Sequence, residues 1–410
     1  MVTITPFKAL RPEAQLAKAV ASRPYDVLNS KEAKIEAQGN SHSFLHITKA
    51  EIGLPDTIDI HSPEVYEKAK ENLTAFISRN ILFRENKPCY YIYRLTMNGR
   101  SQAGLVCGSS VDDYENGLIK KHEFTRPEKE LDRINHIKTT GAQTGNVFLA
   151  YKNVTKIDAV LNGWMEEKNP QYDFIAGDGV QHSIWIVSDD DTIANITQLF
   201  KTLVPATYIA DGHHRAASAA KVRAALKTAA TENADYFLTT LFPSNQLFIM
   251  DYNRVIKDLN GLSAKEFLQK VSEHFTVTVQ TEAYRPQAAH EFGIYLEGQW
   301  YKLSAKPGTY NQADPIAVLD ISILEQNILK PILNINDQRT DERIDFVGGI
   351  RGLGELEKRV DSSDMALAIS LYPVSIEQLF AVADSGEVMP PKSTWFEPKL
   401  RDGLLTHLID

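Results

Sequence analysis

The sequence predicts a mixed α/β or α+β protein, and three observations support this fold class. Segments with strand character alternate along the chain with segments of helical periodicity, as in layered α/β and α+β architectures. The 410 residues are enough for two or three domains with an ample buried core. In residues 207–230 a strand pattern is followed directly by an Ala-rich helical pattern.

The composition disfavours several classes of protein. The chain is 43% hydrophobic and 24% charged, and its formal net charge of -9 comes without any Lys/Arg-rich block. Nucleic-acid binding by phosphate neutralisation is therefore disfavoured. The most apolar stretch, residues 365–383, contains Pro373, Glu377 and Gln378, so we expect a buried strand and a helix capped by Ser375 there, and no membrane span.

The cysteine usage and the first residues both favour a cytoplasmic protein. Only two cysteines occur, Cys89 and Cys107, and both lie in one predicted hairpin. We expect two reduced, buried thiols, as is typical of a reducing compartment. The chain opens without the apolar region of a secretory signal. The sequence leaves the oligomeric state open, and a homo-oligomer is compatible with it.

The chain as far as residue 210 is predicted to alternate between helices and strands. Ser62 and Pro63 begin a helix whose apolar residues recur at helical spacing. Residues 89–97 and 102–108 form a hairpin that turns at Asn98-Gly99. Thr125, with Glu128 three residues on, predicts a capped helix. The remaining elements expected here are strands at 147–151, 183–187 and 207–210 and a helix over 191–203.

After about residue 258 the pattern changes. Residues 292–305 predict a hairpin that turns near Gly298, a helix is expected around 321–332, and the glycines of 348–354 predict a loop. We place domain boundaries near residues 110 and 258. They give an N-terminal α/β region over 1–110, a central core over 111–258 and a C-terminal α+β domain over 259–410.

The richest candidate site is residues 210–215, Ala-Asp-Gly-His-His-Arg, between the predicted strand and the helix of about 216–230. Unpaired backbone N–H groups and the positive end of the helix dipole make such a turn an anion site, for which phosphate is best suited. Gly212 allows a sharp turn and the close approach of a ligand. An Asp N-cap followed by solvated side chains is the alternative. The residues assigned to this site are Asp211, Gly212, His213, His214 and Arg215.

Four further polar segments are candidates. Glu123 lies among cations just before a predicted helix, where it is either an ionised general base or a solvated helix-start acid. The segment 389–396 is made rigid by two prolines, and it either offers Lys392, Ser393 and Thr394 to an anion or is a plain loop. The other candidates, for which a turn or a satisfied histidine is the alternative, are Arg23, Tyr25, Asp26, His122 and His182 as substrate contacts.

Several well-known signatures are absent from the sequence. There is no P-loop, no Gly-x-Gly-x-x-Gly after a strand, no His-Glu-x-x-His and no Gly-x-Ser-x-Gly. Three histidines with Asp211 have the ligand chemistry of a transition-metal site, but the adjacent His213 and His214 must point in different directions. Mg²⁺ held by Asp211 and the phosphates of a nucleotide is the better metal hypothesis.

Five short segments carry a resemblance to a known family. They are residues 23–26 (Arg-Pro-Tyr-Asp), 43–46 (Ser-Phe-Leu-His), 122–125 (His-Glu-Phe-Thr), 210–215 (Ala-Asp-Gly-His-His-Arg) and 389–394 (Met-Pro-Pro-Lys-Ser-Thr). In this order they resemble the bacterial domain-of-unknown-function 1015 family, over nearly the whole chain. The last two segments are the most specific, and the family as a whole is uncharacterised.

A remoter resemblance carries more chemistry. The His-Glu pair followed by Asp-Gly-His-His-Arg is similar to the free L-serine kinases built on the ParB/sulfiredoxin-like fold. This resemblance implies a ParB/sulfiredoxin-like nucleotide-binding core over 111–258, with additional α+β domains, and an insertion between the two motifs. It also implies Glu123 as the base, Asp211 as the acid that orients the metal or substrate, and His213, His214 and Arg215 as phosphate contacts.

We therefore expect a small-molecule kinase that uses Mg²⁺ and transfers phosphoryl from ATP or ADP to a hydroxyl of a small polar metabolite such as free serine. Two alternatives stay open. One is a nucleotide-binding regulator, like ParB, without turnover. The other, weaker one is a metal-dependent hydrolase that uses His122, His213 and Asp211. Glu123 discriminates between the first two, because a kinase needs a base and a regulator does not.

Overall fold

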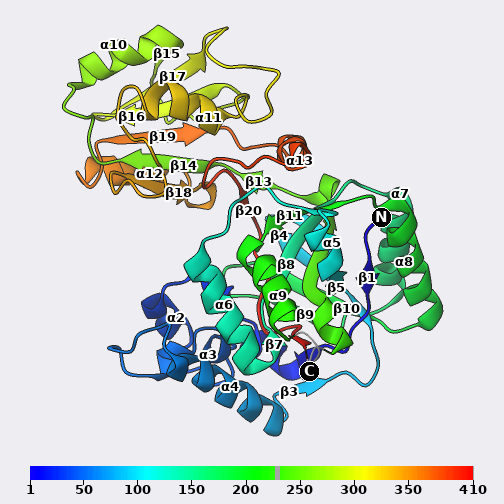
Figure 1. Ribbon diagram of the computed structural model, residues 1–410. Coiled ribbons are helices and arrows are strands. Elements are labelled where there is room, and N and C mark those ends of the chain that lie inside the picture. Colours follow the sequence, from blue (N-terminus) through cyan, green and yellow to red (C-terminus); the bar gives the residue numbers. More distant parts are fainter. Residues whose placement is uncertain (227–230, 410) are drawn as a thin grey trace. The chain divides into compact units, whose positions relative to one another are not determined.

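The chain forms two units in the computed structural model, which describes residues 1–226 and 231–409 (Figure 1). The first unit combines residues 1–247 with residues 398–410, and the second comprises residues 248–397. The mixed α/β class predicted from the sequence is confirmed, because helices alternate with the strands of a large mixed sheet. The division into three domains and the ParB/sulfiredoxin-like core stay predictions.

A nine-stranded mixed sheet forms the centre of the first unit. Its order is β6-β11-β8-β12-β5-β4-β10-β9, and β1 pairs with β5. The β6–β11 and β8–β12 pairs are parallel, whereas the other pairs are antiparallel. The strands are β1 (Ile4–Thr5), β4 (Tyr90–Met97), β5 (Arg100–Ser110), β6 (Ile119–Lys120), β8 (Val147–Tyr151), β9 (Tyr172–Ile175), β10 (Gln181–Val187), β11 (Thr207–Asp211) and β12 (Tyr236–Pro243).

The predicted hairpin is the β4–β5 pair. Met97 pairs with Arg100 across Asn98 and Gly99, whose φ angles are 52° and 78°. Two successive positive φ angles are the geometry of a tight two-residue hairpin turn, which explains the Asn-Gly signal. Cys89 and Cys107 are buried free thiols, as the sequence predicts.

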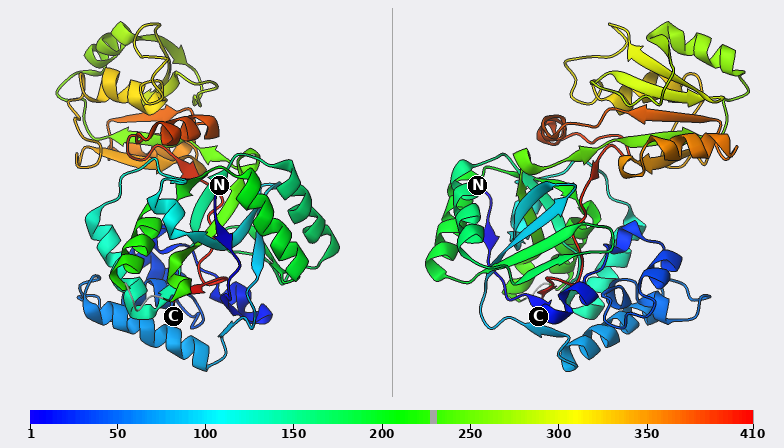
Figure 2. Two further views of the ribbon diagram at one scale, coloured as in Figure 1. Left: turned by 45° about the vertical axis from the view of Figure 1, so that its right-hand side comes forward. Right: turned by 180° about the vertical axis from the view of Figure 1, so that it is seen from behind.

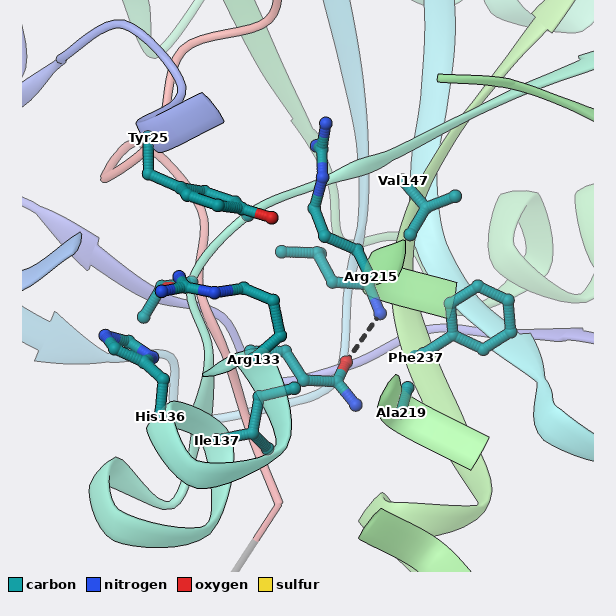
Figure 3. Close-up of a pocket in the computed structure, with 12 residues that line it drawn as sticks. Tyr25, Arg133, His136, Ile137, Val147, Arg215, Ala219 and Phe237 are labelled. Carbon is teal, nitrogen blue, oxygen red and sulfur yellow. Dashed lines mark hydrogen bonds between the residues drawn. The ribbon is translucent and has the colours of Figure 1, made fainter. Parts of the chain in front are cut away.

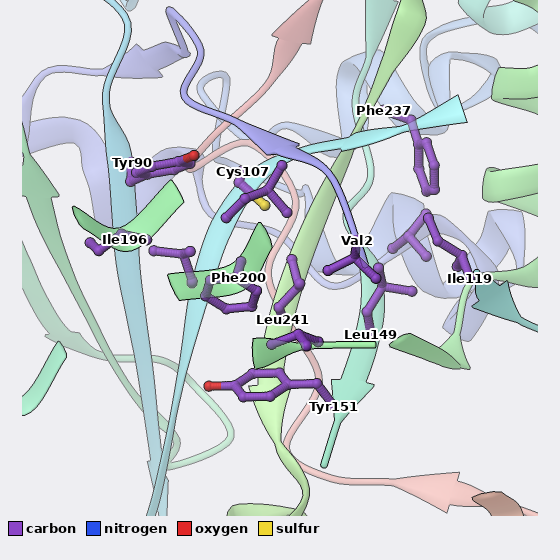
Figure 4. Packing of buried hydrophobic residues seen from close by; sticks show 14 of the residues in the cluster. Val2, Tyr90, Cys107, Ile119, Leu149, Tyr151, Ile196, Phe200, Phe237 and Leu241 are labelled. Atoms are coloured by element: carbon purple, nitrogen blue, oxygen red, sulfur yellow. The ribbon is translucent and has the colours of Figure 1, made fainter. Parts of the chain in front are cut away.

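One hydrophobic core, drawn in Figure 4, packs against one face of this sheet. Val147, Leu149 and Tyr151 of β8 belong to it, because alternate residues of a strand point to the same face. They meet side chains from α7 (Thr155–Glu167), α8 (Asp190–Leu203) and α9 (His213–Leu226). On the other face the C-terminal segment crosses the sheet (Figure 2), and the hydroxyl of Tyr93 accepts a hydrogen bond of 3.2 Å from the backbone N–H of Arg401.

Two helices of the first unit begin within one residue of the start that the sequence predicts. The helix predicted at Ser62-Pro63 is α4, and the helix predicted over 191–203 is α8, with Asp189 as its N-cap. The last part of the helix predicted to about residue 230 lies outside the described residues. The other helices are α1 (Ala17–Val20), α2 (Ser30–Glu36), α3 (Leu45–Thr48), α4 (Pro63–Ser78), α5 (Val111–Glu115) and α6 (Pro127–Thr140), and the small sheets pair β2 (Leu10–Pro12) with β3 (Leu82–Arg84) and β7 (Ala142–Gln143) with β21 (His407–Leu408).

The cap predicted at Thr125 is wrong. Helix α6 begins at Pro127, and Arg126 is its N-cap residue without a side-chain cap. Proline is favoured in the first turn because the N–H group it lacks would have no partner there. The hydroxyl of Thr125 instead donates to the side chain of Glu130.

The second unit contains a six-stranded antiparallel sheet in the order β15-β17-β16-β19-β14-β18. The predicted hairpin over 292–305 is β16–β17, and the predicted strand and capped helix within 365–383 are β19 and α13, with Ser375 and Gln378 in a capping box. Within residues 1–226 and 231–409, no helix combines the length and the apolar run that a membrane span needs. The elements are β13 (Ile249–Met250), β14 (Tyr252–Ile256), α10 (Ala264–His274), β15 (Phe275–Gln280), β16 (Glu291–Leu296), β17 (Gln299–Ala305), α11 (Asp320–Leu324), β18 (Ile344–Gly348), α12 (Leu353–Asp361), β19 (Leu367–Leu371), α13 (Ile376–Ser385) and β20 (Trp395–Phe396).

Candidate active site

The predicted strand and turn are present, as is the predicted helix as far as Leu226, and they form the centre of the candidate site. Strand β11 ends at Asp211, Gly212 has a φ of +99°, and α9 begins at His213. A Cβ atom on Gly212 would lie 3.2 Å from Cζ and Nε of Arg215 and 3.3 Å from the Cα of Val147. The positive φ and the lack of space both favour glycine here, as the sequence predicts for a tight turn.

Arg215 is buried, and its guanidinium joins three segments of the first unit. Nη1 donates to the carbonyl oxygen of Asn146, and Nη2 lies 3.2 Å from Oδ2 of Asp26 and 3.5 Å from Oδ1 of Asp211. Burial alone would lower the pKa of Arg215, but the carboxylates of Asp26 and Asp211 raise it above its usual value. These ion pairs hold the Asp26 segment and the end of β11 together, so Arg215 supports the turn from inside the protein.

Asp211 lies between two cations. Its Oδ2 is 3.2 Å from Nζ of Lys399 and its Oδ1 is 3.5 Å from Arg215, while 30% of the side chain remains exposed. Burial alone would raise the pKa of Asp211, but the charges of Lys399 and Arg215 hold it well below its usual range. The carboxylate is therefore ionised at neutral pH and pairs with a lysine that comes from the C-terminal segment.

The two adjacent histidines of the motif accept hydrogen bonds from the loop that carries Glu123. The backbone N–H of His122 donates to Nε2 of His213 at 3.4 Å, and that of Arg126 donates to Nε2 of His214 at 3.0 Å. Burial lowers the pKa of His213 to about 3 although the Asp211 carboxylate opposes the shift, and burial also lowers the pKa of His214. Both rings are therefore neutral, and neither Nε2 is available to donate to a phosphate.

Glu123 lies in this loop with its carboxylate next to His213. Nδ1 of His213 is 3.5 Å from Oε2 of Glu123, and 35% of the glutamate side chain is exposed. The buried ring of His122 packs edge-on against that of His213, with 4.6 Å between the centroids. Neither ring nitrogen of His122 has a hydrogen-bond partner among the described residues. The partly exposed carboxylate of Glu123 thus lies next to the buried imidazole of His213, which packs against the buried imidazole of His122.

A small cavity with both polar and apolar lining residues lies beside Arg215, and Tyr25 and Arg133 also line it (Figure 3). Its volume of about 20 Å³ has room for about one water molecule. The guanidinium of Arg133 stacks over the ring of Tyr25 at 3.9 Å and pairs with Asp132 at 2.7 Å. Tyr25 therefore faces an internal cavity, whereas Arg23 is half-exposed and forms an ion pair with Glu36 at 2.5 Å.

Asp402 is a second acid that the C-terminal segment brings to this region. The residue is 2% exposed, and its Oδ2 has no hydrogen-bond partner in the part of the chain that the structure describes. Burial raises the pKa of Asp402 to about 7, against the opposing charge of Arg215. A buried carboxyl without a full set of partners favours its protonated form.

Residues 4–322 match a family model described as a protein of unknown function, DUF1015, and this match spans most of the 410 residues. The chain belongs to the DUF1015 family. The family resemblance inferred from the five sequence segments is thereby confirmed. No match to this DUF1015 chain is found among the curated proteins.

Three solved structures are similar to the DUF1015 chain at low identity. A mutant free serine kinase in complex with AMP is 12% identical with a TM-score of 0.37, and the match covers 72% of this chain and 87% of that chain. A conserved hypothetical protein from Pyrococcus furiosus is 12% identical with a TM-score of 0.33, covering 73% and 94%. C-terminally truncated SbnI from Staphylococcus aureus is 11% identical with a TM-score of 0.37, covering 71% and 82%. TM-scores this low do not establish a shared fold.

Other candidate residues of the DUF1015 chain have partners that favour a structural role. His182 is fully buried, and its two ring nitrogens contact the hydroxyl of Tyr93 at 2.8 Å and Nε of Arg401 at 3.4 Å. Ser393 donates to the carbonyl oxygen of Pro390 at 2.6 Å within the second unit. The predicted roles of Lys392, Ser393 and Thr394 in phosphate binding, and of His182 in substrate binding, stay predictions.

The residues around Asp211 do not fit a resident Mg²⁺ ion. Mg²⁺ prefers one or two carboxylates free to coordinate it, together with water and phosphate oxygens. Both oxygens of Asp211 face cations, and Asp26 is paired with Arg215. Over the described ranges, no group of three or more His, Cys, Asp or Glu side chains is arranged to hold a metal. Mg²⁺ that accompanies a nucleotide would therefore be coordinated by the nucleotide's own phosphates.

Two important residues were missed by the sequence reasoning. Lys399 and Asp402 lie far along the chain from the 210–215 motif, so no local spacing connects them with it. The one available signal is compositional. Lys399 comes just before Leu400, and Arg401 and Asp402 lie between Leu400 and Leu404; charged residues among apolar ones are often paired or functional.

Proposed function

We propose that this DUF1015 chain is a small-molecule kinase that transfers phosphoryl from a nucleotide to the hydroxyl of a small polar metabolite. One observation carries the proposal, namely that Glu123 and Asp211, which are far apart in the sequence, both lie next to the buried His213. Nδ1 of His213 is 3.5 Å from Oε2 of Glu123, and His213 begins α9 two residues after Asp211 ends β11. A carboxylate base and a charged anion site are thus adjacent, as phosphoryl transfer requires.

The first turn of α9 supports the binding of the nucleotide phosphates. The first backbone N–H groups of a helix have no partner within the helix, and the helix dipole adds positive potential at this end. Gly212 presents no side chain at the entrance to the turn, and Lys399 brings an ammonium group to Asp211. Phosphate oxygens bound here would meet N–H donors and a cation, which offset the charge that develops during transfer.

Glu123 is the proposed base. It accepts the proton of the acceptor hydroxyl while the hydroxyl oxygen forms a bond to phosphorus and the bond from phosphorus to the bridging nucleotide oxygen breaks. ADP leaves when ATP is the donor, and AMP leaves when ADP is the donor. Free serine is the acceptor that the motif resemblance implies, and other small hydroxyl-bearing metabolites suit the same chemistry.

The test is an assay for turnover. The full chain is incubated with Mg²⁺, ATP or ADP and a panel of amino acids and other hydroxyl metabolites, and phosphomonoesters are detected by ³¹P NMR and mass spectrometry. The expected result is one phosphorylated acceptor formed in step with loss of the nucleotide. Nucleotide binding in calorimetry without a phosphorylated product would overturn the kinase proposal in favour of the regulator without turnover.

Glu123→Gln tests the base directly, because glutamine keeps the size and hydrogen bonding of the side chain but accepts no proton. We expect kcat to fall by about 10²–10⁴-fold, while calorimetry gives an unchanged nucleotide affinity. Glu128→Gln, in the exposed first turn of α6, is the matched control and should leave kcat unchanged. Equal turnover in the Glu123→Gln variant would contradict the assignment of the base.

A further inference from the structure

The two histidines of the Asp-Gly-His-His-Arg motif contact the Glu123 loop at two points, one on either side of Glu123. His213 accepts from the backbone N–H of His122, the residue before Glu123, at 3.4 Å. His214 accepts from the backbone N–H of Arg126, three residues after it, at 3.0 Å. The loop between β6 and α6 is therefore hydrogen-bonded near both of its ends to the first turn of α9.

The direction of these hydrogen bonds fixes the tautomer of each ring. A ring nitrogen that accepts a hydrogen bond from a backbone N–H carries no proton, so the single proton of each neutral imidazole is on Nδ1. In His213 this protonated Nδ1 lies 3.5 Å from Oε2 of Glu123. The backbone of one segment thus determines that His213 presents a donor, and not an acceptor, to the carboxylate.

The surroundings keep the rings neutral. His213 is 4% exposed, and burial lowers its pKa to about 3. The charge of Asp211 opposes the shift, and His214, Arg215 and Lys121 add to it. The carboxylate of Glu123 and the ring of His122 also face His213. Protonation of Nε2 would remove the acceptor for the His122 N–H, so the neutral state is needed for the loop contact.

We infer that His213 and His214 are positioning residues that hold Glu123 over the first turn of α9, with His213 as a fixed hydrogen-bond donor to the Glu123 carboxylate. The separation of 3.5 Å is longer than a hydrogen bond, and contacts of this kind tighten when the ligands of an enzyme bind. This inference rests on the proposed kinase function for the role of Glu123. It replaces the earlier expectation that the two imidazoles contact phosphate.

The loop contacts are tested first without any assay of activity. In His214→Leu, amide hydrogen exchange should accelerate at Arg126, and in His213→Leu it should accelerate at His122. Glutamine variants at both positions should restore protection, because the Oε1 atom of glutamine accepts an N–H where Nε2 did. Unchanged exchange at both amides in the leucine variants would overturn the inference, whether or not the protein is a kinase.

Turnover and its pH dependence then test the role of the donor. His214→Leu should lower kcat tenfold or more with nucleotide affinity within twofold of wild type, and His214→Gln should recover most of the loss.

His213→Gln retains the loop contact but does not reproduce the fixed Nδ1–H, so the acidic limb of its kcat–pH profile should move to higher pH. His274→Gln in the second unit is the control. An unshifted limb in His213→Gln would refute the donor role, whereas absence of turnover in wild type would refute only the proposed function.

Discussion

Lys399 provides one of the two positive charges next to Asp211 in the candidate site. Without it, the Asp211 carboxylate would retain Arg215 as a neighbour, and Arg215 is already shared with Asp26 and Asn146. The positive charge available to a phosphate would therefore fall by one unit at the entrance to α9.

We predict that Lys399→Met weakens nucleotide binding about tenfold, which corresponds to about 1.4 kcal/mol and is reasonable for a charge-assisted contact. Lys399→Arg keeps the charge and should retain most of the affinity. Isothermal titration with ATP and ADP measures both variants. A methionine variant that binds as tightly as wild type would mean that the phosphates lie elsewhere.

Asp402 provides a prediction about stability. Its pKa in the folded protein is raised to about 7 by burial, against an ordinary value of 3.8. Since the unfolded chain releases this proton first, the wild type loses stability as the pH rises from about 4 to 7, and the loss then levels off. Asp402→Asn resembles the protonated acid and avoids this loss.

The stability advantage of Asp402→Asn over wild type should therefore grow by up to about 1.4 kcal/mol for each pH unit between 4 and 7. Urea denaturation at a series of pH values measures it, with Asp364→Asn on the surface as the control. An advantage that is the same at every pH would be evidence against the buried protonated carboxyl.

At the scale of elements, the turn from β11 to α9 depends on one glycine. Gly212 combines a φ of +99° with neighbours at 3.2–3.3 Å from any Cβ. We predict that Gly212→Ala destabilises the fold by about 1–3 kcal/mol, because it places a side chain in a sparsely allowed conformation as well as in contact with Arg215.

Gly163 in α7 is the matched comparison, because nothing lies within 4 Å of its added Cβ and it is inside a helix. Gly163→Ala should stabilise the protein by about 0.4–1 kcal/mol. Chemical denaturation should therefore show that Gly212→Ala lowers the free energy of unfolding and that Gly163→Ala raises it. Equal effects would mean that the turn tolerates a side chain.

The sequence predicts elements well where the signal is local. The Asn98-Gly99 hairpin, the capping box of Ser375 and Gln378 and the start of α4 depend on a few adjacent residues, and each is confirmed. The predicted cap at Thr125 is wrong because Pro127, two residues later, sets the helix start. Competing local signals only two residues apart are a common reason for such errors.

The candidate site is less predictable than the elements, because its contacts join distant parts of the chain. The motif at 210–215 is recognisable from its polar residues, but the partners of its side chains are not. That His213 and His214 accept from a loop about ninety residues earlier follows from the parallel pairing of β6 with β11, which no residue pattern specifies. The same is true of Lys399 beside Asp211.

At the scale of the whole molecule, buried titratable groups make stability depend on pH. Burial lowers the pKa of four histidines from 6.5 to about 3 or 4, and these are His122, His136, His182 and His213. The stability they contribute is fully present above about pH 6.5 and is lost as the pH falls, because the unfolded chain takes up their protons first.

Asp320 and Asp402 act in the opposite sense, because burial raises their pKa values to about 7 and the folded protein binds their protons first. Between pH 5 and 6 the unfolded chain therefore binds about two more protons than the folded protein. We expect the free energy of unfolding to fall by about 2.7 kcal/mol for each unit by which the pH is lowered in this range. Guanidinium denaturation at pH 7.5, 6 and 5 measures the slope. His182→Gln should reduce it by about half, and a slope of zero would contradict the burial of these neutral rings.

The return of the chain to the first unit at Pro398 has a consequence for biosynthesis. A ribosome completes the Glu123 loop, Asp211 and the first turn of α9 long before it reaches Lys399, and it must make all of the second unit in between. A nascent chain that has not yet released residues 398–402 therefore has Asp211 without its lysine and Arg215 without Asp402 nearby. The charge balance of the candidate site is set only after the whole second unit has been made.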